Sequence, residues 1–212
     1  MHNCSEDHDH EHDHEHDHDD HGDATGPADN LYQHIDIANV ALLNIADDAP
    51  VSSVIKPWHN RLDEALWVES DADDQMIIRI PFTGSVKLRS ILVKAGPGDQ
   101  TPAKLSLFAN QDNIDFSDIA DKHPDQEFHI PESRDVGEYA VKASKFSNLS
   151  SLTLFIPEAQ GADTTRVYFI GLRGSWTERK RAPVITVYES QANLADHEKI
   201  QGFDGVGSRL GS

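Results

Sequence analysis

The sequence of 212 residues predicts an all-β fold, an antiparallel β-sandwich or jelly roll, behind a disordered amino-terminal tail. Short segments rich in β-branched and aromatic residues recur along the chain, separated by turns of Gly, Pro, Ser and Asn. No amphipathic helical pattern of about 10–15 residues lies between these segments, and parallel βαβ units would need such helices. The length suits one domain that buries its own core.

The amino-terminal segment has almost no side chains to bury. From His2 to His21 it consists almost entirely of His, Asp and Glu. Ordering it would cost about 1–2 kcal/mol of backbone entropy per residue without compensating burial, so we predict disorder. The chain is therefore divided into a tail and linker over 1–30, a domain over 31–197, and a flexible Gly- and Ser-rich end over 198–212.

The predicted strands follow the tail at short intervals. In the segment 86–93, Val86 and Leu88 fall on one face and Lys87 on the other, which is typical of a half-buried antiparallel strand. The segment 40–45 is too short to distinguish a helix from a strand, so both assignments stay open. About eight strands are expected, and the clearest are 75–82 and 86–93, separated by a turn at 83–85, then 104–108, 139–144, 149–156, 166–172 and 183–188.

The charge of the chain is strongly acidic. Acidic residues outnumber basic residues by 37 to 18, and ten of the acids precede Ala24. From Ala24 onward, 27 acidic residues still face 18 basic ones. A domain of this sign repels a phosphate backbone, so nucleic acid is not an expected partner.

The cysteine content and the apolar runs indicate a compartment. Cys4 is the only cysteine, which excludes an intramolecular disulfide and a CxxC pair and suits a reducing environment. The amino terminus lacks the basic and apolar regions of a signal peptide, and no run reaches the roughly 18 apolar residues of a membrane span. We expect a protein of the cytoplasm and nucleus that does not bind membranes.

No recognised catalytic motif occurs in the sequence. It contains no GxSxG elbow, P-loop, HExxH helix, or GxGxxG after a strand. The spacing of the histidines beyond the tail gives no indication of a catalytic set; these are His34, His59, His123, His129 and His197. We therefore expect no enzymatic activity and no bound cofactor in the domain.

Four stretches together resemble the PITH domain, the proteasome-interacting module at the carboxyl end of thioredoxin-like proteins. They are 56–58, 68–73 leading into 80–88, 145–148, and the longest, 161–178. The resemblance runs from about residue 31 to about residue 197 and implies a jelly-roll sandwich similar to galactose-binding domains. It also implies a 26S proteasome partner. The chain has no CxxC, so it resembles the stand-alone PITH proteins, and redox activity is not carried over.

The candidate partner-binding residues lie around the third tryptophan. Trp58 and Trp67 are interpreted as core or sheet-edge residues, whereas Trp176 precedes a basic cluster and could contact an acidic partner surface. The alternative is a solvated turn with Trp176 packed in the core. The candidate set is Arg173, Trp176, Arg179, Lys180 and Arg181.

The tail supplies a separate metal-binding hypothesis. Alternating imidazoles and carboxylates offer ligands to Zn, Ni or Cu, although disorder removes pre-organisation and makes such binding weak. The alternative is a soluble tail with no specific ligand. The candidate ligands are His8, His10, His12, His14, His16 and His18.

Taken together, these features predict a monomeric, non-enzymatic protein-interaction module, a 26S proteasome-associated adaptor or regulator. Two alternatives come from other functional classes. One is a jelly roll that binds a small, carbohydrate-like ligand, which rests on fold analogy alone. The other is metal binding or buffering by the histidine-rich tail.

Overall fold

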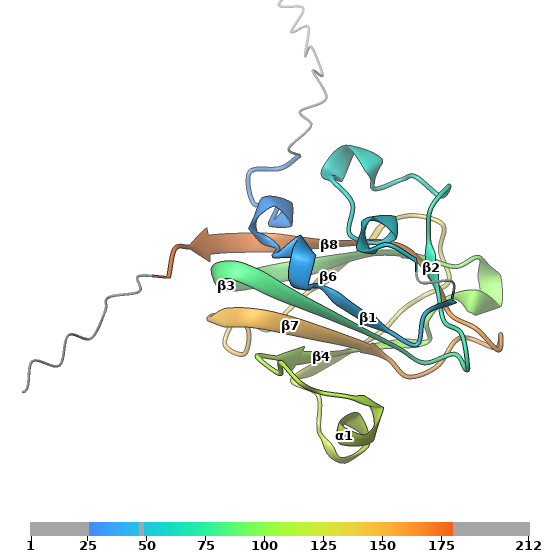
Figure 1. The fold of residues 1–212 in the computed structure, drawn as a ribbon. Helices are drawn as coiled ribbons and strands as arrows, with labels where there is room; N and C mark the ends of the chain where they lie inside the picture. Colours follow the sequence, from blue (N-terminus) through green and yellow to red (C-terminus); the bar gives the residue numbers. More distant parts are fainter. Residues whose placement is uncertain (1–25, 47–48, 180–212) are drawn as a thin grey trace, which may run out of the picture. The chain divides into compact units, whose positions relative to one another are not determined.

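The computed structural model describes residues 26–46 and 49–179. Almost all regular structure in this part of the chain is β-strand (Figure 1). The strands are β1 (Ala41–Leu43), β2 (Val68–Glu69), β3 (Met76–Ala95), β4 (Lys104–Ala109), β5 (Gln126–His129), β6 (Gly137–Ala140), β7 (Leu149–Ile156) and β8 (Arg166–Thr177). One α-helix, α1 (Phe116–Asp121), accompanies 3₁₀ turns at Tyr32–His34, Ile37–Asn39, Val51–Ser53, Trp58–Asn60 and Gly98–Gln100.

The strands form two antiparallel layers that share β3. The first half of β3 pairs with β1 and β7, and β7 continues through β4 to β5. Its second half pairs with β8 on one side and β6 on the other, and β8 continues to β2. Figure 1 shows β8, β3, β7 and β4 lying next to one another in this order, which is the order in which they pair. The predicted all-β antiparallel sandwich is confirmed.

The shared strand differs from the sequence prediction at one point. A turn was expected at 83–85, but β3 runs without interruption from Met76 to Ala95. Its pairing with β7 shifts register between Pro81 and Val86, while Ser85 begins the pairing with β8. The Gly-containing segment therefore bends the strand from one layer into the other instead of reversing it.

The core lies between the two layers. Ile78 and Ile80 from the first half of β3 and Leu88 from its second half are each at most 1% exposed, as is Leu154 of β7. Ile170 of β8 packs in the same cluster. Each such side chain contributes about 1.5–3 kcal/mol through the surface removed from water, so this cluster is the main source of stability.

A smaller apolar cluster covers the outer face of the first layer. Ile77 points opposite to the main core and packs with Phe108 and with Ile119 of α1. This helix was not anticipated from the sequence. Its first turn is fixed by a capping box, in which the Asp115 side chain accepts from the Asp118 N–H and Asp118 bonds back to the Asp115 backbone.

Other predicted segments have mixed outcomes. The segment 40–45, left open above, forms the short strand β1, and the strand expected at 139–144 is instead β6, which ends at Ala140. The predicted strand 183–188 and the tail lie outside the described residues. Within 26–46 and 49–179, no helix is long and apolar enough to cross a membrane.

Candidate partner-binding surfaces

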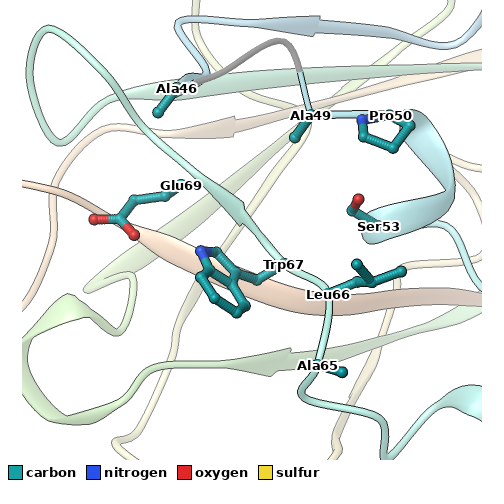
Figure 2. Close-up of a pocket in the computed structure, with 8 residues that line it drawn as sticks. All are labelled: Ala46, Ala49, Pro50, Ser53, Ala65, Leu66, Trp67 and Glu69. Carbon is teal, nitrogen blue, oxygen red and sulfur yellow. The ribbon is translucent and has the colours of Figure 1, made fainter.

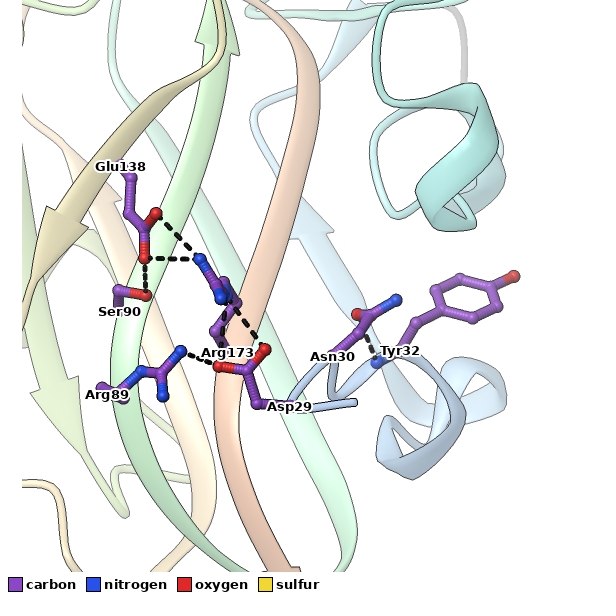
Figure 3. Close-up of polar contacts among 7 residues, drawn as sticks. All are labelled: Asp29, Asn30, Tyr32, Arg89, Ser90, Glu138 and Arg173. Carbon is purple, nitrogen blue, oxygen red and sulfur yellow. Dashed lines mark hydrogen bonds and ion pairs between the residues drawn. The ribbon is translucent and has the colours of Figure 1, made fainter. Parts of the chain in front are cut away.

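Arg173 of β8 lies at the centre of a polar network (Figure 3). Its Nε donates to both carboxylate oxygens of Asp29 at 3.1 Å, and its guanidinium donates to Glu138 at 3.0 and 3.2 Å. Arg89 on the neighbouring strand forms a second ion pair with Asp29. Ser90 donates to Glu138 at 2.5 Å, and this bond, followed by the charge of Arg173, lowers the pKa of the Glu138 carboxyl.

The network anchors the amino-terminal segment to the sandwich. The Gly174 N–H donates to the Asp29 carbonyl at 2.8 Å, and the Leu31 N–H donates to the Leu172 carbonyl at 2.9 Å. The packed region therefore includes residues of the segment that was assigned to the linker. With its side chain only 23% exposed and its donors directed to Asp29 and Glu138, Arg173 acts mainly within the domain.

Trp176 lies over the bend in β3. Its indole stacks on the His34 imidazole, with ring centroids 4.4 Å apart and an interplanar angle of 7°. A Cβ added to Gly84 would lie 2.3 Å from the indole Nε1, so only glycine leaves room for this ring. Among the described residues, Nε1 has no hydrogen-bond acceptor. The half-buried indole thus fills the corner between the two layers.

Arg179 is exposed and lies apart from the other two candidates. It lines a polar concavity of about 430 Å³ together with Asp36, Arg79 and Asp112. Trp176 and Asp29, the partner of Arg173, line a different concavity of about 380 Å³. Lys180 and Arg181 lie outside the described residues. The structure does not bring Arg173, Trp176 and Arg179 into one pocket, and their role in partner binding stays a prediction.

A second surface, which we call the Trp67 groove, lies beside β2 (Figure 2). Its volume is about 350 Å³, and side chains from two separate segments form its walls. The lining residues are Ala46, Ala49, Pro50 and Ser53 on one side and Ala65, Leu66, Trp67 and Glu69 on the other. Leu66 is 50% exposed and Trp67 is 40% exposed. The groove is therefore open and predominantly apolar.

Two buried lysines hold the loop that presents this surface. Lys56 is 4% exposed, and its ammonium donates to the carbonyls of Asp63 and Leu66, both at 2.8 Å. Lys94, also 4% exposed, pairs with Glu64 at 2.9 Å. Burial lowers the pKa of Lys56, although the Asp63 carboxylate opposes this change. Buried ammonium groups are costly without partners, and this loop supplies both acceptors of Lys56 and one of the two partners of Lys94, the other being the Arg134 carbonyl.

The Trp67 ring is held from two sides. The Arg166 guanidinium lies 4.7 Å from its centroid, and the Tyr168 ring meets it edge-on with centroids 6.5 Å apart. Arg166 in turn donates to Glu69 at 2.6 and 3.0 Å. Burial tends to raise the pKa of Glu69, but this pair and a hydrogen bond from Thr164 outweigh it, and the pKa is lowered.

The acidic residues after β2 have local structural roles. Asp73 accepts from the Gln75 N–H and from the Asn44 side chain, and Asp74 accepts from the Ala159 N–H. No group of three or more His, Cys, Asp or Glu suited to a metal ion occurs in the described part of the chain. The tail histidines proposed as Zn, Ni or Cu ligands lie outside it, so the metal hypothesis stays a prediction.

The Trp67 groove was missed by sequence reasoning, which assigned Trp67 to the core or a sheet edge. The sequence feature that could have indicated this groove is the segment 62–67, in which three large apolar residues occur without the alternation of a strand. Leu62, the first of them, is 59% exposed. Large apolar side chains in a polar loop indicate a contact surface more strongly than those in a strand.

Comparison with known proteins identifies a family. A model described as the PITH domain matches residues 21–192. The chain is 42% identical to PITH domain-containing protein CG6153 of Drosophila melanogaster over 193 residues, 90% of each chain. It is 42% identical to PITH domain-containing protein 1 of Homo sapiens over 180 residues, 83% of this chain and 84% of the human protein. A Schizosaccharomyces pombe relative, P35G2.02, is 38% identical over 203 residues, covering 94% of this chain and 93% of that protein.

Solved structures show a more distant likeness. The family 32 CBM from C. perfringens NanJ, determined in complex with galactose, covers 66% of this chain and 96% of its own, with a TM-score of 0.49 and 10% identity. A fucolectin from Morone saxatilis covers 68% of this chain and 50% of its own, with a TM-score of 0.47 and 12% identity. Values this low carry no inference about a ligand, so the carbohydrate-like alternative stays a prediction.

Proposed function

The chain belongs to the PITH domain family, a family of protein-interaction modules, and on this basis we propose that it is an adaptor or regulator of the 26S proteasome. The observation that carries the proposal is the extent of the family match, which spans 21–192 and includes both tryptophan surfaces described above. The adaptor acts by protein contact, without catalysis or a bound cofactor. We place it in the cytoplasm and nucleus as a monomer.

The architecture supports such a role because it offers rigid surfaces. The exposed residues lie on a sandwich whose layers share one strand, and the loop beside β2 is held by Lys56 and Lys94. Contact residues that are already ordered lose less conformational entropy on association. A domain of this kind can therefore bind a partner without first folding around it.

Retention of the purified full-length chain on immobilised 26S proteasome tests the proposal. We expect binding with a dissociation constant in the micromolar range or tighter. Arg179→Ala removes an exposed cation of the predicted site, and Lys142→Ala removes an exposed cation outside it. Absence of retention at micromolar concentration would overturn the proposal, whereas equal retention of both variants would remove Arg179 from the interface.

A further inference from the structure

A small cavity lies at the edge of the main core, beside the last residues of β3. Its volume is about 120 Å³, and all of its lining residues come from the stretch 93–139. The structure describes the backbone of every residue in this stretch. We call this space the Thr101 cavity, and it is lined by Val93 and Ala95 of β3, by Gly137 and Tyr139 of β6, and by Thr101, Ile130, Pro131, Ser133 and Asp135 from the connecting segments.

One lining residue carries a buried hydroxyl that the fold does not use. Thr101 is 1% exposed, and its Oγ1 has no hydrogen-bond partner in the described part of the chain. Its backbone groups are both engaged, since its N–H donates to the Gly98 carbonyl and its carbonyl accepts from the Gln160 N–H, both at 2.9 Å. A buried hydroxyl without a partner is costly and uncommon, which singles out this group as one that a bound molecule would satisfy.

A second hydroxyl lies at the same cavity. A Cβ added to Gly137 would lie 2.8 Å from the Tyr139 Oη, so the phenol end of the ring rests over this glycine. Burial raises the pKa of the Tyr139 hydroxyl, with no contribution from a charge or a hydrogen bond among the described residues. The ring packs against Phe128, with centroids 5.4 Å apart. Thr101 and Tyr139 therefore each offer one donor and an acceptor oxygen to a bound molecule.

The loop that forms part of the wall is fixed by hydrogen bonds of its own backbone. The buried Lys94 ammonium donates to the Arg134 carbonyl, and the Asp135 N–H donates to the Ser133 Oγ at 3.1 Å. Neither bond uses the Thr101 or Tyr139 hydroxyl. A wall that is already ordered loses little conformational entropy when a ligand binds.

The charges of the lining favour an uncharged ligand. Among the described residues that line the cavity, Asp135 is the only charged one, and its exposed carboxylate repels an anion. The buried part of the lining consists of apolar side chains and the Thr101 hydroxyl, so a cation seated there would lose its water without a buried counter-charge. A ligand with one neutral hydrogen-bonding group and a short carbon chain meets neither cost.

The volume of the cavity limits the size of the ligand. A cavity of about 150 Å³ holds benzene, so about 120 Å³ accommodates about five non-hydrogen atoms. A hexose has about 12 non-hydrogen atoms and exceeds this space. The cavity is therefore a different site from one that would serve the carbohydrate-like alternative.

We propose that the Thr101 cavity binds a small uncharged molecule of about five non-hydrogen atoms, a short-chain amide or alcohol. Its polar group exchanges hydrogen bonds with the Thr101 and Tyr139 hydroxyls, and its carbon chain packs against Val93, Ala95 and Ile130. The domain itself binds this ligand, whether or not its protein partner is the proteasome, so the site lies beyond the proposed function.

Amide NMR titration of the full-length protein with two pairs of isosteric probes tests the proposal. Propionamide and butan-1-ol are uncharged, and propionate and n-butylammonium are their charged counterparts. We expect the uncharged probes to bind with millimolar dissociation constants and to shift amides at 93–101 and 130–139, and the charged probes to bind about ten-fold more weakly. Galactose should leave these amides unchanged.

Three results of this titration would overturn the proposal. They are charged probes that bind as well as the uncharged ones, shifts centred on other residues, and no saturable shift up to about 100 mM probe. Because no proteasome takes part, these results are independent of the retention experiment.

Two variants that each remove one hydroxyl make the test specific to the cavity. Thr101→Val replaces Oγ1 by a methyl group, and we expect it to weaken propionamide about five-fold without lowering the stability of the free protein. Tyr139→Phe should weaken the same probe by a similar factor. Thr177→Val removes a hydroxyl outside the cavity and should leave the affinity unchanged. Unchanged affinity in either cavity variant, or a marked loss of stability to urea in Thr101→Val, would overturn the proposal.

Discussion

The two tryptophan surfaces of this domain use similar residues for different purposes. Trp176 packs against Gly84 and stacks on the His34 ring, so it is half-buried and held within the domain. Trp67 is supported by Arg166 and Tyr168 but remains 40% exposed beside an open groove. The difference shows that a tryptophan near arginine indicates a contact surface only when part of its ring has no intramolecular neighbour.

The largest effect on stability is expected from replacing Lys56, the buried lysine that bonds to the loop before β2. Lys56→Met should lower the free energy of unfolding by about 3 kcal/mol, because the carbonyl groups of Asp63 and Leu66 lose the buried ammonium that donates to both of them. Urea denaturation measures the loss, and faster amide exchange at 63–67 would locate it. The exposed Lys142→Met should leave both measurements unchanged. An unaltered midpoint for Lys56→Met would show that the loop is held by other contacts.

A somewhat smaller loss is expected at the bend of β3. Gly84→Ala should cost about 2 kcal/mol, since the new methyl group would overlap the Trp176 indole and the Thr177 carbonyl. Chemical denaturation of the single variant and of the same change in a Trp176→Ala background measures the coupling. The added cost should be smaller in that background. Full additivity would contradict the packing described for Trp176.

Replacement of Arg173 tests whether this arginine stabilises the fold or contacts a partner. Arg173→Ala should cost about 1–2 kcal/mol, because Asp29 and Glu138 lose their hydrogen-bond donor. Its stability is measured by denaturation, and its retention on the 26S proteasome is measured under conditions where the variant is folded. Retention equal to that of the unchanged chain would assign Arg173 to the fold. A loss of binding in the folded variant would restore it to the interface.

The smallest effect concerns acid stability at the Trp67 groove. The pKa of Glu69 is lowered in the folded chain, so its charged form contributes stability above the unfolded pKa of about 4.3. This contribution is lost as the pH falls below 4.3 and through the folded pKa. Glu69→Gln should therefore show a flatter loss of stability over that interval in pH-dependent denaturation. Identical pH profiles would exclude a net contribution from the pair with Arg166.

The strands were predictable because the residue pattern that indicates a strand lies within one short segment of the chain. Alternation of apolar and polar residues at 86–89 and the apolar, β-branched content of 149–156 predict strands from side-chain chemistry alone, and both segments lie in strands. The continuity of β3 was not predictable, because Gly84 is equally suited to a turn and to a bend. The choice depends on Trp176, which is distant in sequence and packs on that glycine.

The candidate surfaces were harder to predict for a similar reason. Burial of Lys56 and Lys94 is set by carbonyls and carboxylates in a loop that the sequence does not place beside them. In the sequence, Arg173 is a candidate interface residue. In the structure, packing of the amino-terminal segment places Asp29 next to it, and the two side chains pair within the domain. Long-range contacts of this kind decide whether a polar side chain remains available to a partner.

The sharing of β3 between the two layers has a consequence for cooperativity. Neither layer can separate from the core without breaking a ladder that includes this strand, whose pairs extend to β1, β7, β8 and β6. The domain should therefore open as one unit, and hydrogen-exchange protection should be similar on both sides of the bend at Gly84. A strand that joins two sheets in this way couples distant surfaces to a single unfolding transition.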